Sequence, residues 1–242
     1  MLTSDKSPSD SKMVCIHQPD FFPWLGFFDK IIRSDIFIIL DHVQFPKKGG
    51  TYCNRVKILV HGKEQWVTAP IDRSYSGYKA ITEMRFQDGV PWREKMVKII
   101  SNNYCKAPFY KETFHFFESL IFNPENNICT YNINSIKSIA RLFNINTKKF
   151  FMSSQLNQGG MATEMLIKLT HAVGGDSYMC GSGAAGYQEN EKFKTAGIKL
   201  LHRDYKHPLY NQFSANEFTP GLSIIDAFMN CGVSGVKLLL EP

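Results

Sequence analysis

The most informative pattern in the chain covers residues 13–45, where apolar and polar segments follow one another in a regular order. Residues 13–16 form an apolar run, and residues 25–34 carry apolar side chains at the spacing of an amphipathic helix. Residues 36–40 are continuously apolar, which is typical of an interior parallel strand covered on both faces. The pattern therefore predicts a strand, a helix and a second strand, which together make a βαβ unit.

Shorter patterns predict the remaining secondary structure. Partial alternation at residues 52–58 and 65–70, around a turn at 61–63, predicts a β-hairpin. Helical spacing of apolar residues predicts helices at 92–102, 109–122, 128–144, 161–173 and 218–232. Short apolar runs predict further strands at 149–152, 176–180 and 198–201.

These elements predict an α/β fold with a mainly parallel sheet flanked by helices, a β-hairpin excursion and a helical insertion. The 242 residues, 43% of them hydrophobic, are enough for one large domain with a substantial core. Residues 1–12 are polar and are expected to form a disordered leader, followed by a single α/β domain at 13–242. Within that domain, residues 91–146 are expected to be the helical insertion or a lid.

Two polar clusters stand at the predicted carboxyl ends of the first two strands. The first is a loop that begins with His17 and Gln18 and contains two prolines, which restrict its backbone. The second begins with Asp41 and ends at Gln44. Ligands of parallel α/β sheets bind outside the carboxyl ends of the strands. Both clusters are therefore predicted to border a ligand and to be neighbours in space.

His17 and Asp41 are the candidate catalytic residues, and several roles are open to each. His17 could donate a hydrogen bond to a phosphoryl oxygen, act as a general acid or base, or tie down its loop. Asp41 could position an amine or hold a metal ion, or it could be a buried aspartate that caps its strand. No metal site is expected, because the sequence has no HxH or HExxH spacing, and it also lacks a GxSxG nucleophile motif.

Further residues supply candidate substrate contacts. The first hairpin strand is partly basic, a run of small residues at 181–187 allows close approach of a ligand to the backbone, and residues 205–212 mix aromatic rings with hydrogen-bond donors. A sugar or a nucleobase suits this mixture of groups. The predicted substrate-binding residues are Gln18, Trp24, Gln44, Asn54, Arg55, Lys57, Ser182, Gly183, Tyr187, Tyr205, His207, Tyr210 and Gln212.

Composition narrows the range of partners. The formal net charge is +6, but the Lys and Arg residues are spread along the chain, so a nucleotide or nucleotide-sugar explains the excess as well as nucleic acid does. Nucleic-acid binding ranks last. The six cysteines form no CxxC pair, which indicates reduced thiols rather than a zinc knuckle or a disulfide framework. The sequence shows neither a secretory signal nor a run of about 18 apolar residues, which predicts a soluble, cytoplasmic protein.

Five motifs occur together, which are HQPDFFPWLGFFDKI, DHVQF, NRVKI, YMCGSGAAGY and FTPGLSIIDAFMNCG, starting at residues 17, 41, 54, 178 and 218. With these motifs the chain resembles, over residues 13–232, the WbqC-like family of bacterial polysaccharide gene clusters. The resemblance implies a role in the assembly of O-antigen, the polysaccharide of lipopolysaccharide, or of a related glycan. It also implies an activity that attaches glycine or another amino acid to an amino sugar.

The activity implied by the resemblance requires an activated acyl group, for which ATP is the expected cosubstrate. The opening strand, HQP loop and helix are similar to those of Rossmann-like HUP-type ligases, an analogy at the level of the fold. It implies that His17 and Gln18 contact the nucleotide phosphates at the start of the helix. Lys57 or Arg55 would stabilise charge, and Asp41 would orient the amine.

The expected partners are an amino acid and a nucleotide-linked amino sugar, the sugar being held by residues 182–187 and 205–212. The oligomeric state stays open, with a homodimer as one option. The alternative function is that of a non-catalytic nucleotide-sugar or glycan-binding protein that assists a partner enzyme, because the same aromatic and amide residues would serve it. Calorimetry would separate the two, since a binder takes the sugar without turnover and without ATP.

Overall fold

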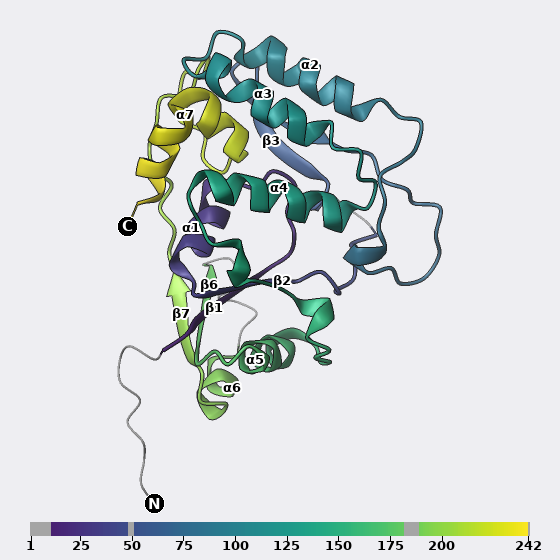
Figure 1. Cartoon of the computed structure of the whole chain (residues 1–242), viewed down its shortest axis with the longest axis vertical. Helices are drawn as coiled ribbons and strands as arrows, with labels where there is room; N and C mark the ends of the chain where they lie inside the picture. The colour runs from purple at the N-terminus through teal and green to yellow at the C-terminus, as the bar shows by residue number, and fades with distance from the viewer. Residues whose placement is uncertain (1–10, 48–50, 182–188, 242) are drawn as a thin grey trace, which may run out of the picture. The chain divides into compact units, whose positions relative to one another are not determined.

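The computed structural model describes residues 11–47, 51–181 and 189–241 of the chain (Figure 1). The chain separates into two compact units. The first consists of Met1–Gln18, Lys30–Leu40 and Thr147–Lys206, and the second of Pro19–Asp29, Asp41–Asn146 and His207–Pro242. The single domain, with 91–146 as an insertion or lid, stays a prediction.

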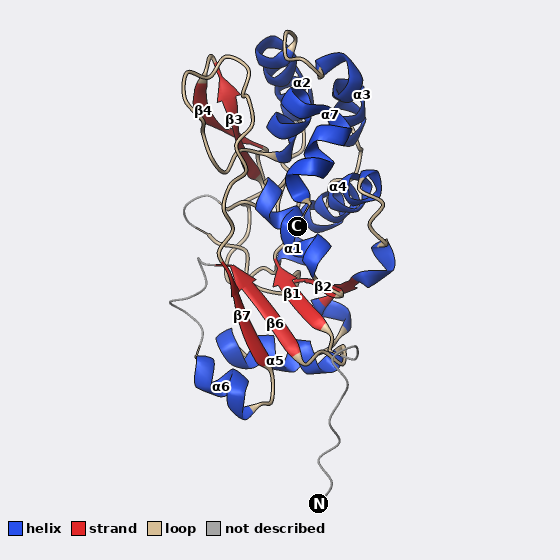
Figure 2. Ribbon diagram, turned by 90° about the vertical axis from the view of Figure 1, so that its left-hand side faces the viewer, coloured by secondary structure: helices blue, strands red, loops and turns tan. Residues whose placement is uncertain are grey.

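A five-stranded sheet forms the centre of the first unit (Figure 2). All its neighbouring strands are parallel, and their order across the sheet is β5-β2-β1-β6-β7. The strands are β1 (Met13–His17), β2 (Ile36–Ile39), β5 (Phe150–Met152), β6 (Ser177–Gly181) and β7 (Lys199–Arg203). With the helices that flank it, the sheet confirms the predicted α/β fold.

The helical elements of the first unit are α1 (Leu25–Arg33) from Lys30 onward, α5 (Ala162–Ala172) and α6 (Asn190–Thr195), with the 3₁₀ turns η3 (Thr147–Lys149) and η4 (Ser153–Gln155). α6 packs next to α5 and β7 (Figure 1). After α5, Gly174 has a φ of 70°, and Gly175 lies so close to Val14 and Thr170 that no Cβ fits there. The sequence patterns did not predict α6, since six residues are too few to show a helical period.

The strand order reverses beside β1. Along the chain, the sheet grows from β1 through β2 and β5 on one side and then through β6 and β7 on the other. The register between β1 and β6 covers Met13 with Ser177 and Val14 with Tyr178, whereas β7 pairs with all five residues of β6. In open parallel sheets, a reversal of this kind leaves a crevice at the carboxyl ends of the two central strands. His17 and Gly181 end those strands.

The second unit contains an antiparallel hairpin, β3 (Arg55–Val60) and β4 (Lys63–Thr68), which confirms the predicted hairpin. Its turn is formed by His61 and Gly62, with φ values of 51° and 74°. Two consecutive positive φ values match the twist of the flanking strands.

The helices of the second unit are α2 (Trp92–Tyr104), α3 (Tyr110–Ile121), α4 (Ile128–Leu142), α7 (Ile224–Leu240) and the 3₁₀ turn η2 (Ile81–Glu83), together with α1 up to Asp29. α3 packs against α2 and α7 (Figure 1). The last helix starts and ends later than the predicted 218–232. It starts after Ser223, whose Oγ accepts a hydrogen bond from the N–H of Ile225. Gly232 interrupts it with a φ of 67°, where the ring of Phe109 leaves no room for a Cβ.

An aromatic cluster forms the core of the second unit. Phe21 packs edge-on against Phe22 with ring centroids 4.8 Å apart, and it stacks on Tyr131 at 5.9 Å. Phe86 and Trp92 complete the cluster at 4.6 Å from each other. Because Phe21 and Phe22 are almost fully buried, the second half of the 17–24 loop is anchored by apolar burial.

One carboxyl group, that of Asp226, is fully buried in the second unit. The hydroxyl groups of Tyr104 and Tyr210 donate hydrogen bonds to its two oxygens, each at 2.7 Å. The Tyr104 hydroxyl in turn accepts a hydrogen bond from the N–H of Leu59 at 2.9 Å. Burial raises the pKa of Asp226 to about 6, although these hydrogen bonds favour its charged form.

The raised pKa of Asp226 should make the free energy of unfolding depend on pH. Between pH of about 4 and about 6 the folded chain holds a proton at Asp226 that the unfolded chain has lost, so the free energy of unfolding falls as the pH rises. We expect Asp226→Asn to remove this slope, which amounts to about 3 kcal/mol in total. Urea unfolding at a series of pH values measures it. Asp88→Asn, which changes an exposed carboxylate of the same unit, should keep the wild-type slope, and an unchanged slope in Asp226→Asn would contradict the assignment.

Candidate functional site

Three residues of the first unit meet at the carboxyl edge of its sheet. His17 ends β1, Gly181 ends β6, and Lys30 extends from α1 toward both. A Cβ added to Gly181 would lie 3.1 Å from the Nζ of Lys30, so the missing side chain leaves room for the ammonium group. The N–H of Leu40 donates a hydrogen bond to the carbonyl oxygen of His17 at 2.7 Å, which brings the end of β2 to the same edge.

His17 is a neutral imidazole at physiological pH. Burial, helped by the positive charge of Lys30, lowers the pKa of His17 to about 3, against a hydrogen bond to Gln18 that raises it. The Nδ1 atom lies 3.1 Å from the carbonyl oxygen of Gln18, and because a carbonyl only accepts, Nδ1 carries the proton. Nε2 is therefore an acceptor, which suits a hydroxyl or amine group of a ligand better than a phosphoryl oxygen.

Lys30 is half-buried, and its Nζ forms no hydrogen bond or ion pair with the residues that the structure describes. Its charge lies beside a neutral imidazole rather than a carboxylate. A half-buried cation at the carboxyl edge of a parallel sheet attracts anions, phosphate groups among them. Lys30 is thus a candidate ligand-binding residue that the sequence patterns did not single out.

The neighbouring cysteine is not an activated nucleophile. The Sγ of Cys180 lies 3.3 Å from the Nδ1 of His202 and 3.5 Å from the carbonyl oxygen of Leu201. Burial raises the pKa of Cys180, so the thiol keeps its proton at neutral pH.

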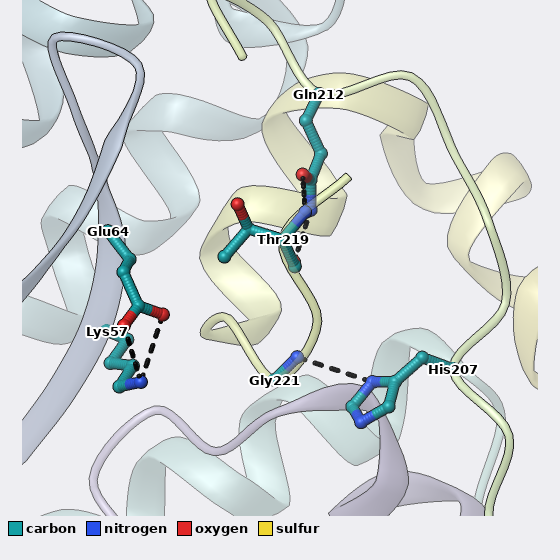
Figure 3. A network of polar contacts seen from close by, with 6 residues as sticks. All are labelled: Lys57, Glu64, His207, Gln212, Thr219 and Gly221. Atoms are coloured by element: carbon teal, nitrogen blue, oxygen red, sulfur yellow. Dashed lines mark hydrogen bonds and ion pairs between the residues drawn. The ribbon is translucent and has the colours of Figure 1, made fainter. Parts of the chain in front are cut away.

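In the second unit, two predicted substrate-binding residues lie against each other. The rings of Trp24 and His207 are 4.9 Å apart and tilted by 32°. The Nδ1 of His207 accepts a hydrogen bond from the N–H of Gly221 at 3.3 Å (Figure 3). Gln212 fixes the same segment, because its side-chain amide donates to the carbonyl oxygen of Thr219 and accepts from its N–H. This segment therefore holds His207 in place.

The hairpin brings two further predicted residues together, as their alternation along the strand requires. Arg55 and Lys57 both lie over the ring of Trp66, and the Nζ of Lys57 forms an ion pair with Glu64 at 2.9 Å (Figure 3). The N–H of Ser223 donates to the carbonyl oxygen of Lys57 at 2.8 Å, which ties the segment after Gly221 to β3.

Other predicted residues of the second unit have structural partners. Asp41 is 3% exposed, and its charge adds to the burial that raises the pKa of Cys129 to about 12. The side-chain amide of Asn54 donates to the carbonyl oxygen of Ala69, and Tyr210 donates to Asp226. Gln44 is exposed beside Ala80. His17 belongs to the first unit and Asp41 to the second, so their expected proximity stays a prediction.

The remaining predicted residues divide into two groups. Gln18 and Tyr205 belong to the first unit, and both are half-buried. Ser182, Gly183 and Tyr187 lie outside the described residues. Their predicted contacts with substrate stay predictions.

Two features of the described residues bear on the class of site. Within residues 11–47, 51–181 and 189–241, no three His, Cys, Asp or Glu side chains are placed to hold a metal ion. In the same ranges, no helix is long and apolar enough to cross a lipid bilayer.

Fold and site define an α/β protein whose parallel sheet carries, where its strand order reverses, a cation without an ion-pair partner among the described residues. The sequence model of the WbqC-like protein family matches residues 18–238, and the chain belongs to this family, as the motifs predicted. The uncharacterized protein Rv1507c of Mycobacterium tuberculosis is 27% identical over 230 residues, which cover 94% of this chain and 97% of that protein. No solved structure matches the chain.

The electrostatic arrangement at the sheet edge can be tested with Lys30→Met. Removal of the positive charge should raise the pKa of His17, which should still stay below the ordinary value of 6.5, because burial is the larger cause and remains. An NMR titration of the His17 ring measures it. Lys199→Met removes an equal charge at the amino end of β7 and should leave the His17 pKa unchanged. An identical His17 pKa in wild type and Lys30→Met would refute the arrangement.

Proposed function

We propose that the protein attaches an amino acid such as glycine to the amino group of a nucleotide-linked amino sugar, in the assembly of O-antigen or a related surface polysaccharide. The glycan context is what the resemblance to the WbqC-like family implies, and the chain belongs to that family. The observation that carries the enzymatic part is the position of Lys30, half-buried and without a partner among the described residues, beside the ends of β1 and β6. This is the edge at which open parallel sheets bind nucleotides.

The proposed reaction uses ATP to activate the amino acid. A carboxylate oxygen of the amino acid bonds to the α-phosphorus of ATP, and pyrophosphate leaves. The neutral amine of the sugar then bonds to the acyl carbon, AMP leaves, and the surplus proton of the amine passes to water. Lys30 offsets the negative charge of the phosphates, and the Nε2 of His17 accepts a hydrogen bond from a hydroxyl or amine of the ligands.

Three residues of the second unit are proposed as contacts of the sugar. Asp41 orients the amine of the sugar, because a carboxylate accepts its hydrogen bonds. The adjacent, tilted rings of Trp24 and His207 offer an aromatic surface for a sugar, and the segment closed by Gln212 and Thr219 keeps His207 in position.

Purified protein incubated with ATP, glycine and a panel of nucleotide-linked amino sugars tests the proposal. Mass spectrometry should detect the glycylated sugar together with AMP and pyrophosphate. We expect Lys30→Met to slow product formation about a hundredfold, as the loss of one charge-stabilising group does. Lys199→Met is the matched control and should keep the wild-type rate.

Two results would overturn the enzymatic proposal. Failure to form a product with any sugar of the panel, combined with an absence of ATP binding, would remove its basis. Calorimetric binding of a nucleotide-sugar that is independent of ATP and gives no turnover would instead establish the alternative, a non-catalytic binding protein.

A further inference from the structure

One face of the β3–β4 hairpin carries aromatic rings and cations that the proposed reaction does not use. In the register of the hairpin, Lys57 is opposite Trp66 and Arg55 is opposite Thr68, so Arg55 is a diagonal neighbour of the indole. The guanidinium carbon of Arg55 lies 4.1 Å from the centroid of the Trp66 ring, and the Nζ of Lys57 lies 5.4 Å from it. Arg55 is thus close enough for a cation–π contact with the indole.

The rings on this face are exposed. Trp66 is 38% exposed and Tyr52 is 54% exposed, although both are large. Their centroids are 5.5 Å apart at an angle of 61°, which is an edge-to-face contact. Trp92, another tryptophan of the second unit, is by contrast packed into its core at 4% exposure. Adjacent exposed rings of this kind are typical of surfaces that bind a ligand.

The two cations on this face differ in their partners. Lys57 contacts both carboxylate oxygens of Glu64, at 3.0 and 2.9 Å, so its charge is offset (Figure 3). The guanidinium of Arg55 forms no hydrogen bond or ion pair with the described residues, and its Nε is buried without a hydrogen-bond partner. Arg55, Lys57 and Glu64 together therefore carry a net charge of +1. Arg55 is the residue whose N–H donors lack acceptors among the described residues. Burying an N–H without an acceptor costs free energy, and a ligand that supplies an acceptor removes this cost.

We propose that this hairpin surface, formed by Tyr52, Arg55 and Trp66, binds a ring compound that carries an oxyanion, a phosphate or a carboxylate. The oxyanion accepts hydrogen bonds from the planar guanidinium of Arg55, whose fork of donors matches that shape. The ring of the ligand packs against the exposed indole or phenol ring. The inference deepens the proposed function, since a nucleotide-linked sugar carries both groups, and it rests on that function only for the identity of the natural ligand.

A purely structural reading of the same contacts makes a different prediction. If the guanidinium serves only to cover the indole, its removal lowers the free energy of unfolding and has no effect on any ligand. Binding of small phosphorylated compounds to the folded chain is therefore the observable that separates the two readings.

Isothermal titration calorimetry of the full chain with four probes tests the proposal. The probes are uridine monophosphate, glucose-1-phosphate, uridine and inorganic phosphate. We expect at least one of the two compounds that combine a ring with a phosphate to bind, and to bind more tightly than uridine or phosphate. A preference for uridine monophosphate assigns the aromatic surface to a nucleobase, and a preference for glucose-1-phosphate assigns it to a sugar ring.

Variants of the hairpin locate the binding. Arg55→Gln should lower the affinity for the preferred probe about tenfold, as the loss of a hydrogen bond to a charged group does. Arg55→Lys should not keep the wild-type affinity, because an ammonium lacks the planar fork of donors. Trp66→Leu should also lower this affinity, whereas Trp66→Phe, which keeps a ring, should retain part of it. Lys63→Gln removes an exposed cation from the same hairpin and should bind like wild type. Thermal unfolding checks that each variant is folded.

The proposal is overturned if neither phosphorylated ring compound binds to the wild type, or if Arg55→Gln binds the preferred probe as tightly as the wild type does. Its failure differs from a failure of the proposed function. Probe binding that depends on Arg55, in a protein that forms no glycylated product, would uphold the hairpin site and reject the transferase. Product formation that depends on Lys30 but keeps the same KM for the sugar in Arg55→Gln would do the reverse.

Discussion

The parallel pairing of β1 with strands on both of its edges is the constraint on which the first unit depends. A central strand has no edge exposed to water, and its side chains are buried on both faces, as Val14 and Cys15 are. Its carboxyl end lies where the strand order reverses, because β2 and β6 pair with its two opposite edges, and open parallel sheets bind ligands at such an edge. The position of His17, the last residue of β1, follows from this topology.

The elements that could be predicted are those whose burial requires a regular spacing of apolar residues along the sequence. The run at 36–40 is apolar throughout because β2 is an interior strand, and the alternation of Arg55 with Val56 reflects a hairpin with one buried face. Lys30 could not be recognised in this way. A lysine in the last turn of an amphipathic helix has the same pattern whether it complements the helix dipole or awaits a ligand. Trp66 was missed for a similar reason, since an aromatic residue in a strand is usually taken as core.

Lys30 and Arg55 share a physical condition that most cations of the chain do not. Both are half-buried, and neither ammonium nor guanidinium has a charged partner among the described residues, whereas the exposed Lys63 is hydrated. Partial removal from water weakens the hydration of a charge without replacing it. Such positions are costly to the folded chain unless an anion fills them, and they therefore point to ligands more strongly than the net charge of +6 does.

The neutral state of His17 has a thermodynamic consequence for whatever binds beside it. The positive charge of Lys30 helps to keep the proton off this imidazole, so an anion that offsets the charge makes protonation easier. Binding of the anion and uptake of a proton are then linked equilibria, and each increases the affinity for the other. This linkage acts in the acidic range near the lowered pKa of His17, because burial, the larger cause of the shift, remains when the charge of Lys30 is offset. An anion bound beside Lys30 would thus be linked to the protonation of His17 only at acidic pH.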